Sequence, residues 1–405
     1  MQTTGALLVS LVTATGLAAA LPTDNNHGKV SVPVTHNRHF KAHGPLALAK
    51  AYRKFNKPVP KDVAAAVAQL NKRATGSVQN VPQQYDSEYL AAVQIGTPAQ
   101  TLKLDFDTGS SDLWVFSTET PGDEVQGQTL YKPNSSSTAH LLQGQSWNIV
   151  YGDSSSSSGD VYSDVVSIGG LKVQGQAVES AQQVSAQFSS GPSSGLLGLA
   201  FGSLNTVFPD RQKTFLENAA PRLDAPLFTA NLNHHAKCRH TDGKYNFGYI
   251  DKSEHTGAIT YTAVDNSQGF WGFTSSGYAV GGGHTNGDAI SGIADTGTTL
   301  LLLDDDVVSS YYSQVSGAQY DGSQGGYTFS CDADLPDFTF GIESSSITIP
   351  GAYMNYAPTD SSEVSCFGGI QGNYGIGVNI FGDIALKAAL VVFDAGNLRL
   401  GWAAK

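Results

Sequence analysis

Residues 102–114 read LKLDFDTGSSDLW, and residues 291–303 read SGIADTGTTLLLL. Each stretch carries the tripeptide Asp-Thr-Gly after a short apolar run and before a hydroxyl residue, Ser110 in the first copy and Thr298 in the second. A loop that occurs twice predicts two related halves whose loops each bring one carboxylate to a common site. Two close carboxylates cannot both ionise cheaply. They therefore share a proton, and one site then holds an acid and a base.

The internal repeat extends beyond these two loops. An apolar-apolar-glycine sequence ends at Gly198 in the first half and at Gly382 in the second, at nearly equal distances after Asp107 and Asp295. A single Asp-Thr-Gly would be interpreted as a turn at the end of a strand. Two copies in the same order predict two β lobes of common ancestry, with a catalytic cleft between them.

Strand patterns dominate the chain after residue 74, so we expect an all-β, bilobal fold with few short helices. The best helical pattern follows Asp304, which is expected to cap the helix, and its apolar stripe from Val307 to Val315 is expected to lie in the core. The serine run at 154–158 is expected to form a hairpin tip. The expected strands lie at residues 89–95, 101–106, 147–151, 161–168, 258–264, 327–331 and 346–350.

The first 73 residues differ from the rest in composition. Residues 6–20 are small and apolar and end in three alanines, which is the pattern of a secretory signal, although no Lys or Arg precedes them. Residues 1–73 hold ten Lys/Arg and two Asp/Glu, whereas the remainder holds 13 basic and 33 acidic residues. This division predicts a signal peptide at 1–20, a propeptide at 21–73 that ends in Lys72-Arg73, and a secreted, extracellular protein.

The charge of the two parts also limits the partners. An acidic body argues against nucleic acid and against anionic membranes as partners. The propeptide carries helical patterns at 46–55 and 61–70, and such segments usually dock on another surface.

Taken in order, a series of motifs resembles the pepsin family of aspartic endopeptidases, and in particular its secreted fungal aspergillopepsin and penicillopepsin group. The resemblance covers roughly residues 85–405. It implies an amino-terminal β lobe at 74–247 and a carboxy-terminal β lobe at 248–405. The motifs that carry it are DFDTGSSDLWVF, YGDSSSSSGDVY, GLLGLAF, NFGYID, QGFWGF, IADTGTTLLLLDDD, CFGGIQ, IFGDI and LGWA.

The resemblance implies that Asp107 and Asp295 are the catalytic pair, which holds a water and activates it for attack on a peptide carbonyl. It also implies three kinds of supporting residue in each loop: a glycine that allows a tight turn, a hydroxyl that orients the carboxylate, and a threonine that ties the loops together. These are Gly109 and Gly297, Ser110 and Thr298, and Thr108 and Thr296.

A flap that closes over substrate is expected where YGD occurs, with Tyr151 bonded to Trp114 and with Gly152 and Asp153 meeting the substrate backbone. In the resembled group a flap Asp with a serine two residues later, Ser155 here, accompanies acceptance of Lys before the cut. We therefore expect cleavage after large apolar residues and also after Lys. Further pocket residues are expected at Phe188, Leu196 and Thr299.

The family's propeptides insert a lysine that is followed by an aromatic residue into the cleft, which implies that Lys54, before Phe55, pairs with the two aspartates. Opposite charges on the leader and the body would hold the zymogen together near neutral pH. Acid would weaken that attraction and permit either self-cleavage or cleavage by a dibasic-cutting protease. The partners implied are protein and peptide substrates, the protein's own propeptide and statine-type peptide inhibitors, with the protein acting as a monomer.

Three cysteines lie in the body, so the sequence alone permits three pairings. Cys331 paired with Cys366 would close a loop worth roughly 3.8 kcal/mol in the chain-entropy model, and this choice rests on the resemblance. Cys238 is then unpaired. Asn134 begins an Asn-Ser-Ser sequon and is a glycosylation candidate.

We expect no cofactor and no metal. The cluster His234, His235, Cys238 and His240 has the residue types of a zinc site, but adjacent histidines rarely face one ion, and the resemblance places a polar loop there.

Two other functions deserve comparison. Residues 105–108 also match the nucleophile loop of haloacid-dehalogenase-type phosphotransferases. That fold needs long helices, which this sequence does not predict. This alternative also leaves the second Asp-Thr-Gly unexplained. A non-catalytic, aspartic-protease-like binding protein is the other alternative. Such proteins usually lack a catalytic Asp, a loop Gly or the flap Tyr, and all of these are present here.

Overall fold

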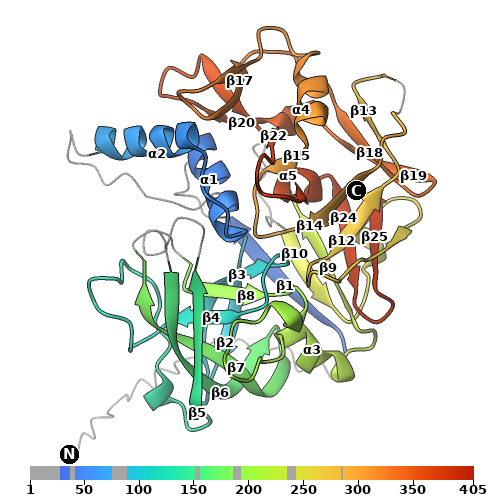
Figure 1. The fold of residues 1–405 in the computed structure, drawn as a ribbon. Helices are drawn as coiled ribbons and strands as arrows, with labels where there is room; N and C mark the ends of the chain where they lie inside the picture. Colours follow the sequence, from blue (N-terminus) through green and yellow to red (C-terminus); the bar gives the residue numbers. More distant parts are fainter. Residues whose placement is uncertain are drawn as a thin grey trace, which may run out of the picture.

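The computed structural model describes residues 28–36, 42–74, 89–150, 156–185, 193–234, 243–283 and 286–405. Figure 1 shows two β-rich parts, one in green and one in orange to red, with the blue helices α1 (Gly44–Lys54) and α2 (Lys61–Ala74) between them on one side. The all-β expectation and the two-part architecture are confirmed. None of the described helices is long and apolar enough to cross a membrane.

One large sheet runs through both parts of the molecule, because strands from the chain's end pair with strands from its middle. The lobe boundary expected at residue 247 therefore falls inside this sheet, directly after β10. In spatial order its strands are β11 (Thr260–Ala263), β25 (Arg399–Ala404), β24 (Ala389–Asp394), β9 (Leu227–Leu232), β10 (Gly243–Phe247), β1 (Val30–His36), β2 (Tyr89–Ile95), β3 (Gln100–Asp107), β8 (Gly195–Gly198), β4 (Leu113–Phe116), β7 (Leu171–Val184), β6 (Ser156–Ile168) and β5 (His140–Val150).

Three smaller sheets build the carboxy-terminal part, together with the helices α4 (Asp305–Tyr312) and α5 (Asp383–Leu386). The short helix α3 (Phe215–Ala219) belongs to the amino-terminal part. The sheets are, in spatial order, β12 (Gly272–Ser275), β14 (Ile290–Ala294), β23 (Asn379–Phe381), β15 (Leu301–Leu303) and β22 (Ile370–Gly372); β13 (Tyr278–Val280), β18 (Phe338–Ile342) and β19 (Ser345–Ile349); and β16 (Gln319–Asp321), β17 (Gly326–Ser330), β21 (Ser365–Gly368) and β20 (Asn355–Pro358).

The duplicated sequence corresponds to a duplicated strand arrangement. Strand β3 lies parallel to β8, with Asp107 opposite Gly198, and β14 lies parallel to β23, with Ala294 opposite Phe381. In each half the strand after the Asp-Thr-Gly loop then runs antiparallel to the same partner, β4 to β8 and β15 to β23. A side chain on Gly198 or on Gly382 would clash with the loop backbone at Ser110 or Thr298, so both positions require glycine.

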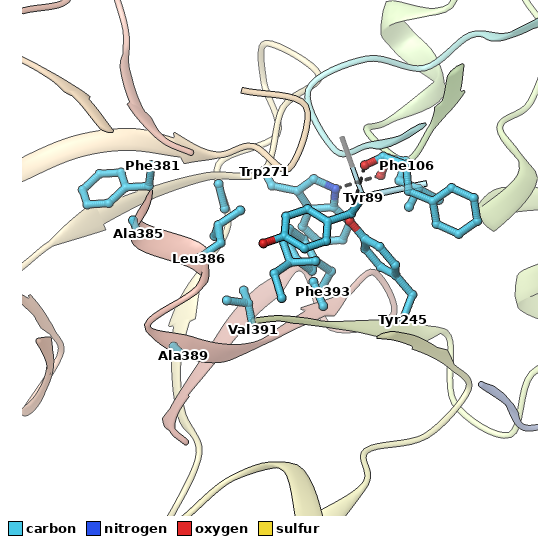
Figure 2. Close-up of a cluster of buried hydrophobic side chains, with 14 of the residues drawn as sticks. Tyr89, Phe106, Tyr245, Trp271, Phe381, Ala385, Leu386, Ala389, Val391 and Phe393 are labelled. Atoms are coloured by element: carbon cyan, nitrogen blue, oxygen red, sulfur yellow. Dashed lines mark hydrogen bonds between the residues drawn. The ribbon is translucent and has the colours of Figure 1, made fainter. Parts of the chain in front are cut away.

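Aromatic packing joins the two halves beneath the loops. The rings of Phe228 and Phe393 stack with centroids 4.6 Å apart, and Trp271 meets Phe393 edge-on at 5.2 Å. The indole nitrogen of Trp271, from the second half, donates to the carbonyl of Leu199, from the first, at 2.9 Å (Figure 2). This buried contact fixes the position of one half relative to the other.

Strand β1 was not expected from the sequence. Its first half, up to Pro33, pairs with β10, and its second half, from Val34, pairs with β2. The leader therefore completes the centre of the large sheet. A proline within a short run argues against a central strand, because proline cannot donate to a ladder, and here it sits where β1 changes partner.

Helix α1 confirms the helical pattern at 46–55, and its apolar face, which includes Leu48 and Tyr52, packs on the carboxy-terminal part. Helix α2 confirms the pattern at 61–70 and buries Val63 and Val67 in the same cluster. Ile293, next to the second loop, belongs to this cluster as well. The two leader helices thus dock on the half of the molecule that carries Asp295.

Helix α4 confirms the helix predicted after Asp304, and its apolar stripe is buried as expected. One detail was wrong. Asp304 stands at the N-cap position, but its side chain makes no capping bond and instead accepts hydrogen bonds from the amides of Asn373 and Asn379, at 3.0 and 3.1 Å. Two amides aimed at one carboxylate satisfy it better than a single backbone N–H. The serine run also differs from expectation, because residues 156–158 already belong to β6.

Cys331 and Cys366 form a disulfide between the ends of β17 and β21, and Cys238 lies outside the described residues. Asn134 is exposed in a short 3-10 turn, Pro133–Ser135, and its glycosylation stays a prediction.

Candidate active site

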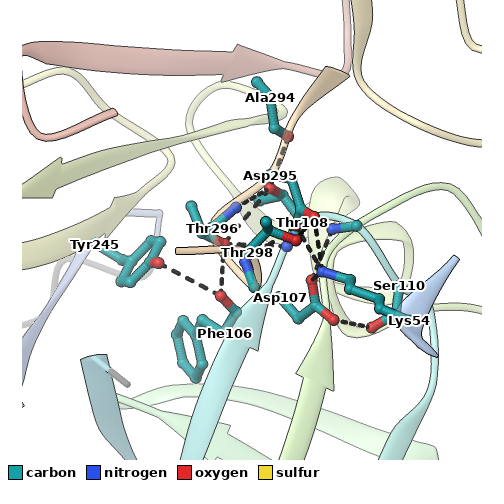
Figure 3. A network of polar contacts seen from close by, with 12 residues as sticks. Lys54, Phe106, Asp107, Thr108, Ser110, Tyr245, Ala294, Asp295, Thr296 and Thr298 are labelled. Atoms are coloured by element: carbon teal, nitrogen blue, oxygen red, sulfur yellow. Dashed lines mark hydrogen bonds and ion pairs between the residues drawn. The ribbon is translucent and has the colours of Figure 1, made fainter. Parts of the chain in front are cut away.

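The two Asp-Thr-Gly loops meet at the ends of β3 and β14, and their threonines cross between them (Figure 3). The backbone N–H of Thr108 donates to Thr296 Oγ1 at 3.1 Å, and the N–H of Thr296 donates to Thr108 Oγ1 at 2.9 Å. Each hydroxyl in turn donates to a carbonyl of the opposite strand, at Ala294 and Phe106. These four bonds are fully buried and nearly symmetric, so they fix the distance between the loops.

Each loop orients its own carboxylate in the same way. Asp107 accepts from the N–H of Gly109 at 2.8 Å and from the hydroxyl of Ser110 at 2.6 Å. Asp295 accepts from the N–H of Gly297 at 3.0 Å and from the hydroxyl of Thr298 at 2.6 Å. The structure therefore brings together the two aspartates and all six supporting residues expected from the sequence.

The side chain of Lys54 enters this site from helix α1 (Figure 3). Its ammonium nitrogen lies 2.6 Å from Asp107 Oδ1, 2.7 Å from Asp295 Oδ1 and 2.9 Å from Asp295 Oδ2. Both carboxylates are thus within hydrogen-bond distance of one atom. The lysine side chain is only 10% exposed, so this is a desolvated ion triad.

Burial and charge act in opposite directions on this triad. Burial tends to raise the pKa of Asp107, but the Lys54 ammonium and the bonds from Ser110 and Gly109 outweigh it and hold the pKa below its usual range. For Asp295, burial together with the charge of Asp107 outweighs Lys54, and the pKa is raised. The pKa of Lys54 is raised, because its attraction to both aspartates exceeds the cost of its burial.

The glycines of the two loops have a different role from the one expected. Neither Gly109 nor Gly297 has a positive φ, so a tight turn does not explain them. A Cβ atom on Gly109 would lie 2.5 Å from Asp295 Oδ1, and one on Gly297 would lie 2.2 Å from Asp107 Oδ1. Each loop glycine therefore makes room for the carboxylate of the other loop.

Phe270 is a site residue that the sequence reasoning missed. Its ring lies 5.7 Å from that of Phe55, directly after Lys54, and it lines a cavity of about 630 Å³ together with Ile293. Its motif, QGFWGF, indicates only the family resemblance. Nothing in the local sequence indicates that this aromatic residue contacts the ring that follows Lys54.

The expected flap and pocket residues are only partly described. Trp114 and Leu196 lie opposite each other on β4 and β8 and share an apolar cluster with Trp147, whose ring stacks on Trp114 at 6.0 Å. Thr299 is buried beside the second loop, where its carbonyl accepts from Ile384. Tyr151, Gly152, Asp153, Ser155 and Phe188 lie outside the described residues.

The possible zinc cluster is also largely outside the described part. Of its four residues only His234 is described, and its ring stacks on Tyr353 with centroids 4.2 Å apart. Within the described ranges, no group of three His, Cys, Asp or Glu side chains has the arrangement of a metal site.

Comparison with known proteins identifies the family. The model of the eukaryotic aspartyl protease family matches residues 88–405. The chain belongs to this family. It is an aspartic endopeptidase, and the resemblance to fungal pepsin-like enzymes is confirmed.

Relatives of high identity match almost the whole chain. Endothiapepsin of Cryphonectria parasitica is 56% identical over 385 residues, which are 93% of this chain and 91% of that protein. Aspergillopepsin-1 of Aspergillus oryzae is 52% identical over 378 residues, covering 93% and 92%. A crystal structure of an aspartic proteinase from Irpex lacteus has a TM-score of 0.65 at 25% identity and covers 78% of this chain and 94% of that one.

The loop glycines give a direct test of the site geometry. Gly297→Ala is expected to lower peptidase kcat by about 10²-fold or more, because the new methyl group must displace the Asp107 carboxylate. Gly322→Ala is the matched control, since nothing lies within 4 Å of the atom it adds. Equal activity of the two variants, measured on a fluorogenic peptide, would contradict the arrangement of the loops.

Proposed function

We propose that this chain is the secreted, monomeric precursor of an acid endopeptidase in which Asp107 and Asp295 together activate a water molecule. The observation that carries the proposal is the contact of both carboxylates with one atom, Lys54 Nζ. A site that holds one ammonium between two carboxylates also has the size and the polarity to hold one water after the lysine leaves. The expected substrates are internal peptide bonds of proteins.

The proposed mechanism needs one ionised and one protonated aspartate, and we assign Asp107 to the ionised role. An ionised Asp107 takes a proton from the water, whose oxygen attacks the peptide carbonyl carbon. A protonated Asp295 donates its proton to the carbonyl oxygen, which gives a gem-diol. Asp107 then gives its proton to the nitrogen, and the ionised Asp295 takes a proton back from one gem-diol hydroxyl, so that the C–N bond breaks and the amine and the carboxylic acid are released. The hydroxyls of Ser110 and Thr298 keep both carboxylates aimed at the water throughout.

Specificity for large apolar residues is part of the proposal. The leader's Phe55 already packs against Phe270 beside the dyad, which supports an apolar subsite at this end of the cleft. Leu196, which is partly exposed, supplies apolar surface in the other half, where it packs on the buried cluster that includes Trp114. Acceptance of Lys before the cut rests on the residues YGD at 151–153.

The leader is proposed to inhibit by occupying the catalytic position. Because Lys54 lowers the pKa of Asp107, the stabilisation from this one ion pair is complete above the ordinary Asp pKa of about 3.9 and is lost as the pH falls through the lower folded value. Acid therefore weakens the hold of the leader. A surface ion pair between Lys29 of the leader and Asp224 of the body, 3.4 Å apart, adds a weaker attraction between the two parts.

The dyad is tested by Asp107→Asn, which is expected to lower kcat by about 10³-fold or more at pH 4 without unfolding the protein. The exposed Asp123→Asn is the control and should retain full activity. A statine-type peptide should block the wild-type enzyme. If Asp107→Asn retained activity, the proposed mechanism would be wrong. If the leader of this variant were still removed at the normal rate, a separate protease cutting at Lys72-Arg73 would be the processor.

Inhibition by the leader is tested by Lys54→Met in the full-length chain. We expect conversion to begin about one pH unit higher than in wild type or more, because the leader loses its ion pairs to both aspartates and less acid is then needed to release it. Lys61→Met, an exposed lysine on the same leader, should convert like wild type. Conversion is followed by gel mobility across pH 3–7. An unchanged pH midpoint in Lys54→Met would refute the inhibitory role.

The Lys preference is tested by Asp153→Ser. This change is expected to remove cleavage after Lys and to spare cleavage after Phe or Leu, as mapped on a peptide library near pH 4. Equal loss of both activities would mean that the Asp153 carboxylate has a structural role only.

A further inference from the structure

A second pair of buried carboxyl groups lies in the amino-terminal half. Asp112 follows the first catalytic loop and precedes β4, and Glu179 lies on β7 opposite Trp114 of β4. The two residues are 3% and 1% exposed. The side-chain nitrogen of Asn205 donates to Asp112 Oδ1 at 2.9 Å and to Glu179 Oε1 at 3.0 Å. One amide thus bridges two carboxyl groups.

The donors around this pair are too few for two charges. Asp112 Oδ1 also accepts from the backbone N–H and the hydroxyl of Thr206, at 2.8 and 3.1 Å. Glu179 Oε2 is buried and has no hydrogen-bond partner among the described residues. A buried carboxylate with an unsatisfied oxygen is costly, whereas a protonated carboxyl can itself donate to its neighbour.

The electrostatic surroundings also disfavour a negative charge on both carboxyl groups. Burial, and after it the charge of Asp112, raises the pKa of Glu179 well above its usual range. Burial also raises the pKa of Asp112, against its bonds from Thr206, and Asp107 adds to this from the catalytic loop. The groups with the strongest effects on the two carboxyls include no cation.

We propose that Asp112 and Glu179 hold one proton between them, and that the loss of this proton as the pH rises sets the upper pH limit of the active enzyme. The pair acts through position and not through contact with substrate. The proposal assumes only that the chain is an aspartic endopeptidase, and it does not depend on how the dyad divides its own proton.

The location of the pair explains why its charge matters to catalysis. The carbonyl of Asp112 accepts from Gly198 N–H at 2.9 Å, and Gly198 lies opposite Asp107 in the β3–β8 pairing. On the other side, β7 pairs with β6, which leads into the hairpin expected to form the flap. Repulsion between two charges at this point separates β4 from β7 and disturbs both the loop of Asp107 and the support of the flap.

The pH dependence follows from the direction of the two shifts. An acid whose pKa is raised by folding stabilises the fold fully below its unfolded pKa, which is about 3.9 for Asp and 4.3 for Glu. That contribution is lost as the pH rises through the raised folded values, because between the unfolded and the folded pKa the folded state holds a proton that the unfolded state has already released. The pair therefore favours the active fold in acid and opposes it toward neutral pH.

The test compares wild type with Glu179→Gln. Each protein is produced as the full-length chain and is then activated in acid. Both are incubated from pH 4 to pH 8, and residual activity is assayed at pH 4 on one peptide. Glu179→Gln keeps the shape and removes one charge, so we expect its inactivation midpoint to rise by about one pH unit or more. Its kcat/KM at pH 4 should match wild type. Asp112→Asn should shift the midpoint in the same direction.

Two other buried carboxylates serve as comparisons. Asp164 is equally buried, but Tyr131, Ser136, Thr138 and the N–H of Val165 all donate to it, so Asp164→Asn should not raise the limit. Asp105 has a pKa raised to about 6, chiefly by burial, and Lys50 of the leader opposes this rise.

An unchanged midpoint in both Glu179→Gln and Asp112→Asn would overturn the proposal. So would a rise produced by Asp105→Asn alone. Failure of both pair variants to fold at acid pH would overturn it as well, because a pair that shares a proton tolerates a neutral amide there. A variant that loses activity at pH 4 because its catalytic dyad is damaged can be distinguished from these outcomes, since its inactivation midpoint does not change.

Discussion

Two carboxylates buried side by side cannot both stay charged without a compensating group, and this constraint organises the catalytic centre. The structure with the leader in place meets it by inserting the Lys54 ammonium between Asp107 and Asp295. Once such a cation leaves, a shared proton is the remaining solution, and a shared proton is what acid–base catalysis by two carboxyl groups needs. The proposed inhibition by Lys54 and the proposed catalysis by the two aspartates thus both compensate the charge of the same buried carboxylates.

Holding the carboxylates together requires the backbone to be just as closely paired. The crossed threonines fix the loops, and each loop glycine leaves space for the opposite aspartate. The leader adds a strand at the centre of the large sheet and two helices on the carboxy-terminal part, so its lysine is delivered from a structured scaffold. The pair of Asp112 and Glu179 meets the same constraint with an amide and a proton in place of a cation.

The catalytic loops were predictable from sequence because duplication repeats both the residues and their order. Helix α4, the leader helices and the seven expected strands follow from local patterns. Other features depend on distant contacts that no local pattern encodes. Strand β1 contains Pro33 and pairs only because two separate strands leave a place for it, and Asp304 is drawn from its capping role by two asparagines far along the chain. The meeting of Asp112 with Glu179 depends on the β4–β7 register.

The most direct measurement is a crystal structure of the full-length chain at neutral pH, where the leader is still in place. We predict a Lys54 nitrogen within about 3 Å of carboxylate oxygens of both Asp107 and Asp295, with the hydroxyls of Ser110 and Thr298 bonded to those same carboxylates. A structure in which the two aspartates lie out of reach of a common atom, or in which Lys54 points to solvent, would contradict it.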